Sequence, residues 1–407
     1  MNKFEPTTLD DFCSVSSGFA FKSEQFSENS NDTFLVKGSN LGHRVIRWDE
    51  GPWWDSSDYE KLQRYQLVAD DVVLAMDRPI VGGQLKFAWI KKSDPKSLLV
   101  QRVACLRAKN VSDQIFLRYV IASPAFLQYI DTITTGVNVP HISGPDIRKY
   151  KFNLPLQEDR QKIAAILLSY DELIENNLER IKLLEEMAEI TYQEWFLRKK
   201  FPGHEEVGFD PETGMPDGWA HRKLGDVVAL HYGKALKAGD RNGGATPVYG
   251  SAGIVGYHDS SLVSGPGIVL GRKGNVGSVY WSHCPFYPID TVYYVASKYS
   301  LYFIYYLLKH QEFINNDAAV PGLNRNAAYA KRVNLPTPEL IEQFDRKVES
   351  TFSAINNLQQ QVELLKEARD ILLPRLMTGM IDIDKVELPE ALLERIDRQN
   401  NNETNIG

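Results

Sequence analysis

The chain repeats itself at an offset of 181 residues, and this internal duplication constrains its fold more than any other feature. Val139-Pro140 and Asn153-Leu154-Pro155 return as Val320-Pro321 and Asn334-Leu335-Pro336, and the long stretches that follow keep the same offset. The unit is far longer than the roughly 20–50 residues of solenoid repeats. It therefore indicates a duplicated half-protein with pseudo-two-fold symmetry. Duplex DNA has a matching symmetry, with half-sites about one helical turn apart.

Composition narrows the class of protein. The 407 residues, 43% of them hydrophobic, predict two to four domains with ordinary cores. We see no apolar run of about 18 residues and no basic-then-apolar leader, so we expect no membrane contact and a cytoplasmic localisation. Cys13, Cys105 and Cys284 form no C-x-x-C pair, which suits a reducing cytosol and argues against a disulfide framework or a zinc site.

Charge is distributed unevenly along the chain. The net charge of −7 comes from residues 154–203 and 335–407, which carry −3 and −6, whereas residues 1–153 and 204–334 carry +1 each. Neither of these two segments has the strong basic excess of a stand-alone DNA-binding domain. Tight binding to DNA would therefore need help from a partner protein.

The pattern of elements predicts an α+β fold with two mixed α/β domains, residues 1–153 and 204–334. Both have short apolar runs separated by Gly, Pro, Asn and Asp, as expected for short strands. Each has one predicted helix, near Gln114–Tyr129 and near Leu301–Phe313. Gly18 corresponds to Gly233 in the second copy.

Two long helices are expected in residues 154–203 and 335–382, with a frayed acidic tail over 383–407. Apolar residues follow a four-then-three spacing, which is typical of a coiled-coil seam, and the two seams can satisfy each other as an antiparallel pair. Asn177 either fixes the register or is a harmless buried amide, and Pro374 should end or kink the second helix. The predicted seam positions are Ile163, Leu167, Ile174, Asn177, Ile181 and Leu184, with Val348, Ile355, Leu358, Val362 and Leu365.

A glycine-rich loop between two predicted strands is the most specific candidate for binding. Arg272, Lys273 and Asn275 lie in it, but Arg272 follows Gly271, so the sequence does not fit a phosphate-binding P-loop. Glycines allow a hairpin tip to approach a surface closely, and Arg or Asn can read base edges in the major groove. The alternatives are a solvated turn, or pairing of Arg272 with an acid such as Asp290. Arg78 lies in the equivalent loop of the first copy, residues 77–83.

Weaker candidates for DNA contact lie in other loops, where a turn residue is the usual alternative. Lysines mark one turn in each half, aromatic and hydroxyl groups lie on a second glycine-rich loop, and polar residues flank the repeated Val-Pro. These candidates are Lys22, Lys234 and Lys237; Tyr249, Ser251 and Tyr257; and Asn138, His141, Asn324 and Arg325.

Sequence motifs for catalysis are missing. There is no G-x-G-x-x-G for a nucleotide or S-adenosylmethionine, no [DN]-P-P-[YFW] methyl-transfer motif and no H-E-x-x-H. The eight histidines form no ligand cluster. We therefore expect no enzyme activity, no metal site and no cofactor in this chain.

The two junctions of the long helices carry a family resemblance. The segment 153–163, a Pro-Leu followed by a Glu- and Gln-rich turn, resembles the entry into the first conserved helix of the specificity subunit (S, HsdS) of type I restriction-modification enzymes. The segment 372–379 resembles the ending of that family's second helix. The likeness spans residues 5 to 384, whereas the second junction, residues 335–340, departs from the Gln-rich form.

The resemblance implies a DNA sequence-specificity subunit without catalysis of its own. Its two α/β domains would be target-recognition domains, each reading half of a bipartite asymmetric target in double-stranded DNA. The helices would set the spacer and dock two modification (methyltransferase) subunits that bring S-adenosylmethionine and methylate a flipped adenine. Two restriction/translocase subunits could join. A DNA-independent scaffold with two binding modules on a coiled-coil stalk is the competing hypothesis.

Overall fold

The computed structural model describes residues 4–49, 51–135, 140–313 and 322–394. The chain divides into two compact units, unit 1 (residues 1–175 and 363–407) and unit 2 (residues 176–362). Two long helices, α5 (Gln157–Tyr192) and α9 (Pro338–Met377), contribute residues to both units. Among the described residues, no helix is long and apolar enough to cross a membrane.

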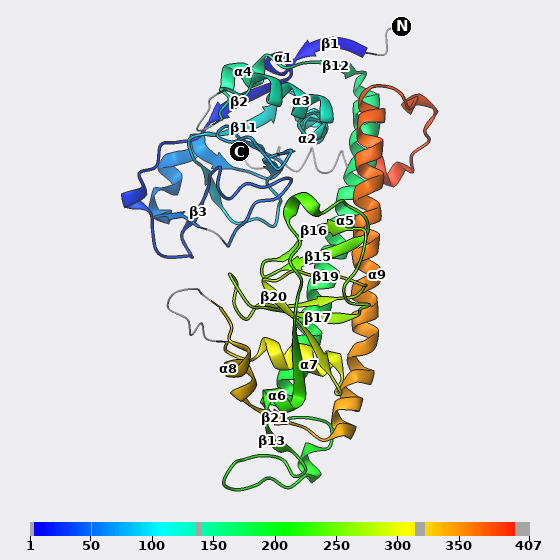
Figure 1. Cartoon of the computed structure of the whole chain (residues 1–407). Coiled ribbons are helices and arrows are strands. Elements are labelled where there is room, and N and C mark those ends of the chain that lie inside the picture. Colours follow the sequence, from blue (N-terminus) through cyan, green and yellow to red (C-terminus); the bar gives the residue numbers. More distant parts are fainter. Residues whose placement is uncertain (1–3, 50, 136–139, 314–321, 395–407) are drawn as a thin grey trace. The chain divides into compact units, whose positions relative to one another are not determined.

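Unit 1 is built around a four-stranded antiparallel sheet in the order β2-β11-β6-β9. Of these strands, β2 and β11 are labelled in Figure 1. A second sheet, β4-β3-β10-β5, contains the parallel pair β3 and β10, and β1 pairs with β12. The strands of unit 1 are β1 (Phe4–Thr8), β2 (Cys13–Ser17), β3 (Thr33–Val36), β4 (Trp53–Trp54), β5 (Gln66–Leu67), β6 (Val72–Ala75), β7 (Ile80–Val81), β8 (Gln84–Leu85), β9 (Phe87–Trp89), β10 (Ser97–Leu99), β11 (Val103–Ala108) and β12 (Lys151–Pro155). The shorter helices of unit 1 are α1 (Leu9–Phe12), α2 (Gln114–Ala122), α3 (Pro124–Ile133) and α4 (Gly144–Arg148).

Unit 2 repeats this plan with the sheet order β14-β20-β17-β18, again antiparallel. A second sheet, β16-β15-β19, contains the parallel pair β15 and β19, and β13 pairs with β21. Its elements are β13 (Ala220–Lys223), α6 (Leu224–Val227), β14 (Val228–Tyr232), β15 (Thr246–Gly250), β16 (Gly253–His258), β17 (Gly267–Gly271), β18 (Val279–Ser282), β19 (Tyr287–Pro288), β20 (Val292–Ser297), α7 (Leu301–Lys309), α8 (Arg325–Ala330) and β21 (Arg332–Leu335).

Gly18 and Gly233 show that the two units share a close backbone approach. A Cβ on Gly18 would lie 2.3 Å from the carbonyl oxygens of Leu99 and Val100, and one on Gly233 would lie 2.1 Å from that of Ile289. In both units the glycine directly follows a strand, β2 or β14. It approaches the chain at the end of a strand that forms a parallel pair, β10 in unit 1 and β19 in unit 2. Only glycine leaves room there, so the correspondence read from the sequence has a steric cause.

The long helices run antiparallel. Within unit 2, Asn177 of α5 donates from Nδ2 to Gln361 Oε1 of α9 at 3.2 Å, and Tyr192 farther along α5 contacts Phe344 nearer the start of α9. The α+β fold with two α/β domains and two long antiparallel helices is therefore confirmed. Of the predicted seam positions, Leu184 and Leu365 are half-buried and all the others are buried.

The ends of α9 have clear local causes. Thr337 Oγ1 accepts a hydrogen bond from the Leu340 N–H at 3.3 Å, and Pro338 occupies the first helical position, where its missing N–H costs nothing. Of the two outcomes expected at Pro374, an end or a kink, the end is wrong, since α9 continues to Met377. The residues after Pro374 still complete the last turn, with the Thr378 N–H donating to the Pro374 carbonyl at 3.1 Å.

Three other expectations need correction. The predicted helix near Gln114–Tyr129 is two helices, because Ser123 precedes Pro124, takes an extended conformation and caps α3 through its hydroxyl. The second predicted helix ends at Lys309 rather than Phe313. The segment after Asp382 is not frayed as far as residue 394, since Ile383 is buried and packs with Val386, Leu388 and Leu393 on the core of unit 1.

Candidate nucleic-acid interface

The loop between β17 and β18 is a compact turn whose conformation requires glycine. Gly274 and Gly277 have φ values of 77° and 82°, in the left-handed region that other residues avoid. The Ser278 hydroxyl lies 2.8 Å from the carbonyl oxygens of Ser251 and Asn275 and ties the loop to the β15–β16 turn. Asn275 is therefore held exposed at the tip.

Arg272 is positioned by an aromatic ring and a backbone carbonyl. Its Nη1 donates to the Asp290 carbonyl oxygen at 3.0 Å, and its guanidinium lies 4.9 Å from the centre of the Tyr232 ring. The Arg325 guanidinium lies 5.2 Å from the same ring. Tyr232 is 47% exposed, so it presents two guanidinium groups close to solvent. Such cation–π contacts stabilise modestly at exposed sites and fix the direction of each arginine.

The layer beneath these arginines is rigid. Burial raises the pKa of Tyr293 to about 12, so its hydroxyl stays protonated and donates to the Leu323 carbonyl at 3.0 Å. The Leu323 N–H donates to the Arg272 carbonyl at 2.7 Å, and Lys273 forms a backbone bridge with Gly322. The start of α8 is thereby joined to the loop, which brings Arg272, Lys273 and Arg325 together.

The remaining predicted residues of unit 2 have different roles. Lys234, Lys237 and Tyr257 are exposed, and Tyr257 lies on β16. Ser251 is half-buried in the β15–β16 turn, where its carbonyl accepts hydrogen bonds. The placement of Tyr249 at the surface is wrong: its side chain is 6% exposed and packs with Phe286 in the core.

Asn324 acts as a helix cap. Its Oδ1 accepts hydrogen bonds from the N–H groups of Asn326 and Ala327 at the start of α8. The side-chain oxygen is therefore already used inside the protein, which leaves Asn324 a structural role in aiming Arg325.

In unit 1 the equivalent loop carries Arg78. The Arg78 N–H donates to the Pro140 carbonyl at 2.6 Å, and its neighbour Asp77 forms a backbone bridge with His141. Arg78 and His141 are both exposed, so the structure brings these two candidates together. Lys22 is exposed in a separate turn, and Asn138 lies outside the described residues.

Further basic residues surround the unit 1 loop and were missed from the sequence. Lys86 Nζ contacts the Gly38 carbonyl, and burial, followed by the charges of Arg47 and Arg78, lowers its pKa. Arg102 Nε lies 4.0 Å from Asp77. Together with Arg78, the residues Arg47, Lys86 and Arg102 come from separate parts of the sequence. No run of basic residues therefore indicates this cluster.

The two loops are structural equivalents. Each follows the central strand that pairs with β11 or β20, and each bridges to the segment preceding a short helix, through Asp77–His141 in unit 1 and Lys273–Gly322 in unit 2. The duplication thus builds one basic site per unit, with exposed Arg78 and His141 in unit 1 and half-buried Arg272, Lys273 and Arg325 in unit 2.

Comparison with known proteins agrees with this duplicated arrangement. The family described as "Type I restriction modification DNA specificity domain" matches residues 1–186 and 216–365. The chain belongs to this family. It is thus a type I restriction-modification specificity subunit, and the expectation of a non-catalytic specificity subunit is confirmed by the family.

Individual relatives are more distant. The MjaIX specificity subunit of Methanocaldococcus jannaschii is 23% identical over 67% of this chain and 70% of its own length. The MjaVIII specificity subunit of the same organism is 31% identical over 42% of this chain and 40% of its own length. The crystal structure of a type I restriction-modification S subunit from M. genitalium has a TM-score of 0.57 at 17% identity, covering 92% of this chain and 96% of its own, and supports the fold alone.

Proposed function

We propose that each unit of this specificity subunit reads one half of a bipartite, asymmetric target in double-stranded DNA. The observation that carries the proposal is the equivalent loop found at the same strand end in both units, with Arg78 in one and Arg272 with Lys273 in the other. Arginine can contact a guanine edge bidentately, and lysine contacts phosphate. Because the two loops differ in sequence, the two half-sites differ too.

The long helices set the spacer between half-sites and dock two modification subunits. The support is a pair of exposed apolar patches at repeat-equivalent positions. Leu183 and Ile190 on α5 are 54% and 57% exposed, and Leu364 and Ile371 on α9, each 181 residues later, are 65% and 45% exposed. Exposed leucine and isoleucine pairs that recur in a duplicated chain fit two copies of one partner.

The partners supply what this chain does not. The modification subunits bring S-adenosylmethionine and methylate an adenine in each target, and they add positive charge to a chain whose net charge is −7. Restriction subunits that translocate and cut DNA are optional partners of the same complex. In this division of labour, sequence reading belongs to the two loops and chemistry to the bound subunits.

Paired arginine variants test the assignment of half-sites. Arg78→Ala and Arg272→Ala, each co-expressed with the modification subunit, are compared by sequencing of methylated sites in the host. Each variant should relax one position, costing about 1–3 kcal/mol of discrimination, and the two positions should fall in different half-sites. Lys347→Ala, an exposed change on α9 at a residue that is not a candidate for DNA contact, is the control. Relaxation of the same half-site by both variants would refute the assignment.

Patch variants test the docking sites. Leu183→Glu with Ile190→Glu, and separately Leu364→Glu with Ile371→Glu, should each reduce the bound modification subunits from two to one in native mass spectrometry, because a buried unpaired charge is strongly unfavourable. Lys347→Glu on α9 is the exposed control. Retention of two subunits by both double variants contradicts the docking model.

The DNA-independent scaffold predicts a different result. Binding of the assembled complex to duplex DNA should weaken steeply with salt, since each phosphate contact releases a counterion. A scaffold would show no salt-dependent, competitor-resistant binding to its target.

A further inference from the structure

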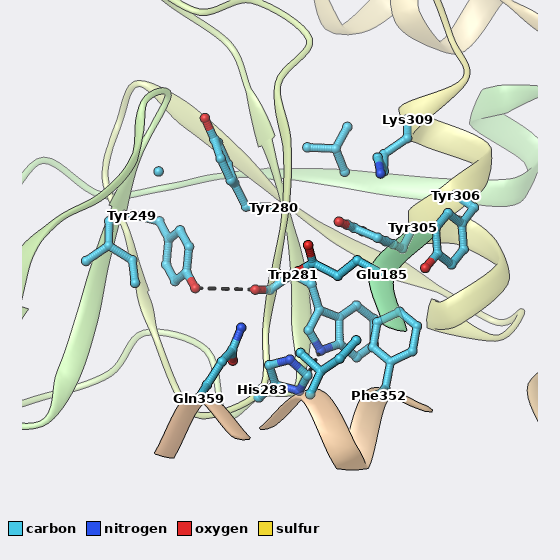
Figure 2. A pocket seen from close by; sticks show the side chains of 14 residues that line it. Glu185, Tyr249, Tyr280, Trp281, His283, Tyr305, Tyr306, Lys309, Phe352 and Gln359 are labelled. Atoms are coloured by element: carbon cyan, nitrogen blue, oxygen red, sulfur yellow. Dashed lines mark hydrogen bonds between the residues drawn. The ribbon is translucent and has the colours of Figure 1, made fainter. Parts of the chain in front are cut away.

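Unit 2 contains a cavity lined mainly by aromatic side chains. Its volume is about 400 Å³, and it lies between β16, β18, α7 and the two long helices (Figure 2). The rings of Tyr280, Trp281, Tyr305, Tyr306 and Phe352 line it, together with the Glu185 carboxylate. Aromatic faces with one carboxylate are the surroundings that a planar cation prefers.

Unit 1 shows what occupies the same place when the chain supplies its own ligand. Trp89 and Tyr119 stand where Trp281 and Tyr306 stand in unit 2, on the equivalent strand and helix. The Arg118 guanidinium lies 5.3 Å from the centre of the Trp89 ring, and the position of Arg118 is taken by Tyr305 in unit 2. There the Arg44 guanidinium lies 3.5 Å from Asp171 and 3.7 Å from Asp370. The Arg44 N–H donates to the Phe87 carbonyl at 2.7 Å, so the side chain enters from the side of β9.

One connection also differs between the units. In unit 1, β3 and β4 are joined by residues 37–52, which carry Arg44 into the interior. In unit 2, the equivalent strand β15 is joined to β16 by Ser251 and Ala252 alone. No residue of that short turn reaches the position of Arg44, and Gly253 and Ile254 at the start of β16 form the cavity wall instead.

The charges around the cavity favour a cation. Lys309 also lines the cavity: its Nζ lies 5.5 Å from the centres of the Tyr305 and Tyr306 rings and pairs with Glu189 Oε2 at 2.8 Å. His310 contacts the other oxygen of Glu189. Glu185 forms no ion pair among the described residues. Burial raises the pKa of its carboxyl, which a bound cation would counteract. Among the described residues that line the cavity, Glu185 is therefore the carboxylate without an ion pair, and the Lys309 charge acts on it only by lowering its pKa.

We propose that the unit 2 cavity binds a guanidinium group, a group that Arg44 and Arg118 supply to the equivalent region of unit 1. The plane of the guanidinium packs against the rings of Trp281 and Tyr305, and its N–H groups donate to Glu185. The group comes from a small free molecule or from an arginine of a docked protein. The assignment does not depend on how the chain reads DNA.

Agmatine, a guanidinium on a short alkyl chain, is the probe. The full chain is labelled with 15N at tryptophan, and the indole resonance of Trp281, whose Nε1 donates to His283 Nδ1 at 3.1 Å, is assigned with Trp281→Phe. Agmatine should shift this resonance in a saturable way, whereas 1,4-diaminobutane, which lacks the guanidinium, should not. Absence of a saturable shift, or an equal response to the diamine, overturns the proposal.

Two variants localise the effect. Glu185→Gln should weaken agmatine binding about tenfold or more by removing the charged acceptor, and Glu186→Gln, an exposed neighbour, should leave it unchanged. Ile254→Arg supplies an internal guanidinium and should abolish agmatine binding while shifting the Trp281 resonance by itself. Unaltered agmatine affinity in Glu185→Gln would also refute the site.

The source of the guanidinium follows from adding the modification subunit. If an arginine of the docked protein fills the cavity, the partner alone shifts the Trp281 resonance and agmatine competes with it. If the ligand is a free molecule, the assembled complex still binds agmatine with unchanged affinity. Each result identifies a source. If Glu185→Gln leaves binding unchanged in both experiments, the cavity is not the binding site.

Discussion

Removal of Arg369 should destabilise unit 1 through one buried carboxylate. Asp171 is 6% exposed, and it accepts hydrogen bonds from Arg369 Nη1 at 2.6 Å and from the Tyr119 hydroxyl at 2.9 Å, with Arg44 at 3.5 Å. Arg369→Met keeps the volume of the side chain but leaves Asp171 with one hydroxyl and one longer ion pair. Breaking a buried ion pair costs about 3–5 kcal/mol, and the remaining Arg44 places this case near about 3 kcal/mol.

Hydrogen exchange gives a local readout of this loss. The backbone amides of α2, which carries Tyr119, should exchange roughly 150-fold faster in Arg369→Met if the protecting free energy falls by about 3 kcal/mol. Lys366→Met on the same helix is the control, because its partner Glu363 is 71% exposed and such pairs contribute about 0–1 kcal/mol. A change below about threefold in α2 would refute the argument that the ion pair is important to the fold.

The repeat itself supplies the compensating variant. At the positions equivalent to Asp171 and Arg369, unit 2 has Phe352 and Ala188, an apolar pair that is buried. Asp171→Phe with Arg369→Ala and Arg44→Met should therefore cost less than Arg369→Met alone, since apolar groups that replace a buried ionic cluster remove the desolvation cost. A triple variant less stable than the single one would show that the cluster contributes more than it costs.

Three further outcomes are expected. Gly233→Ala should destabilise the protein by about 1–3 kcal/mol in urea unfolding, because a Cβ there would lie 2.1 Å from a carbonyl oxygen, whereas Gly239→Ala, with open space around it, should change stability by less than about 0.5 kcal/mol. Burial lowers the pKa of His283 to about 4, so below pH 6.5 the imidazole binds a proton in the unfolded chain but not in the folded one. The free energy of unfolding should therefore fall as the pH drops from 6.5 towards 4. His283→Phe should flatten that fall, and an unchanged slope would contradict the prediction. Lys273→Ala should weaken DNA binding for all sequences alike and lower the slope of log affinity against log salt concentration by about one. An unchanged slope would show that Lys273 makes no phosphate contact.

The sequence predicted what depends on local periodicity. A four-then-three apolar spacing specifies which face of a helix is buried whatever the rest of the chain does, so the seam from Ile163 to Leu184 is buried or half-buried as expected. The β17–β18 hairpin was also predicted, because two apolar runs flank a glycine-rich loop. Ser123-Pro124 shows the limit of this reasoning, since an apolar pattern continues across a proline that splits the helix.

Positions that depend on distant segments were not predictable. Tyr249 has a glycine-rich surrounding that suggests a surface loop, yet β19 and Phe286 bury it. The basic cluster of Arg47, Arg78 and Lys86 forms only when three separate turns meet, and the pairing of Tyr232 with two arginines likewise requires the folded sheet. Burial and charge proximity are tertiary properties, whereas the sequence reports mainly local ones.

The long helices and the loops are constrained differently, because they contact different parts of the protein. A residue on α5 or α9 faces the opposite helix, a sheet core or, at Leu183 and Leu364, the apolar patches that we assign to partners, so nearly every turn is constrained on more than one side. The loops that carry Arg78 and Arg272 are anchored through backbone hydrogen bonds to residues 140 and 291. Backbone anchors tolerate exchange of the side chains they hold. A duplicated chain can therefore keep one pair of helices and one loop geometry while its two loops come to contact different bases.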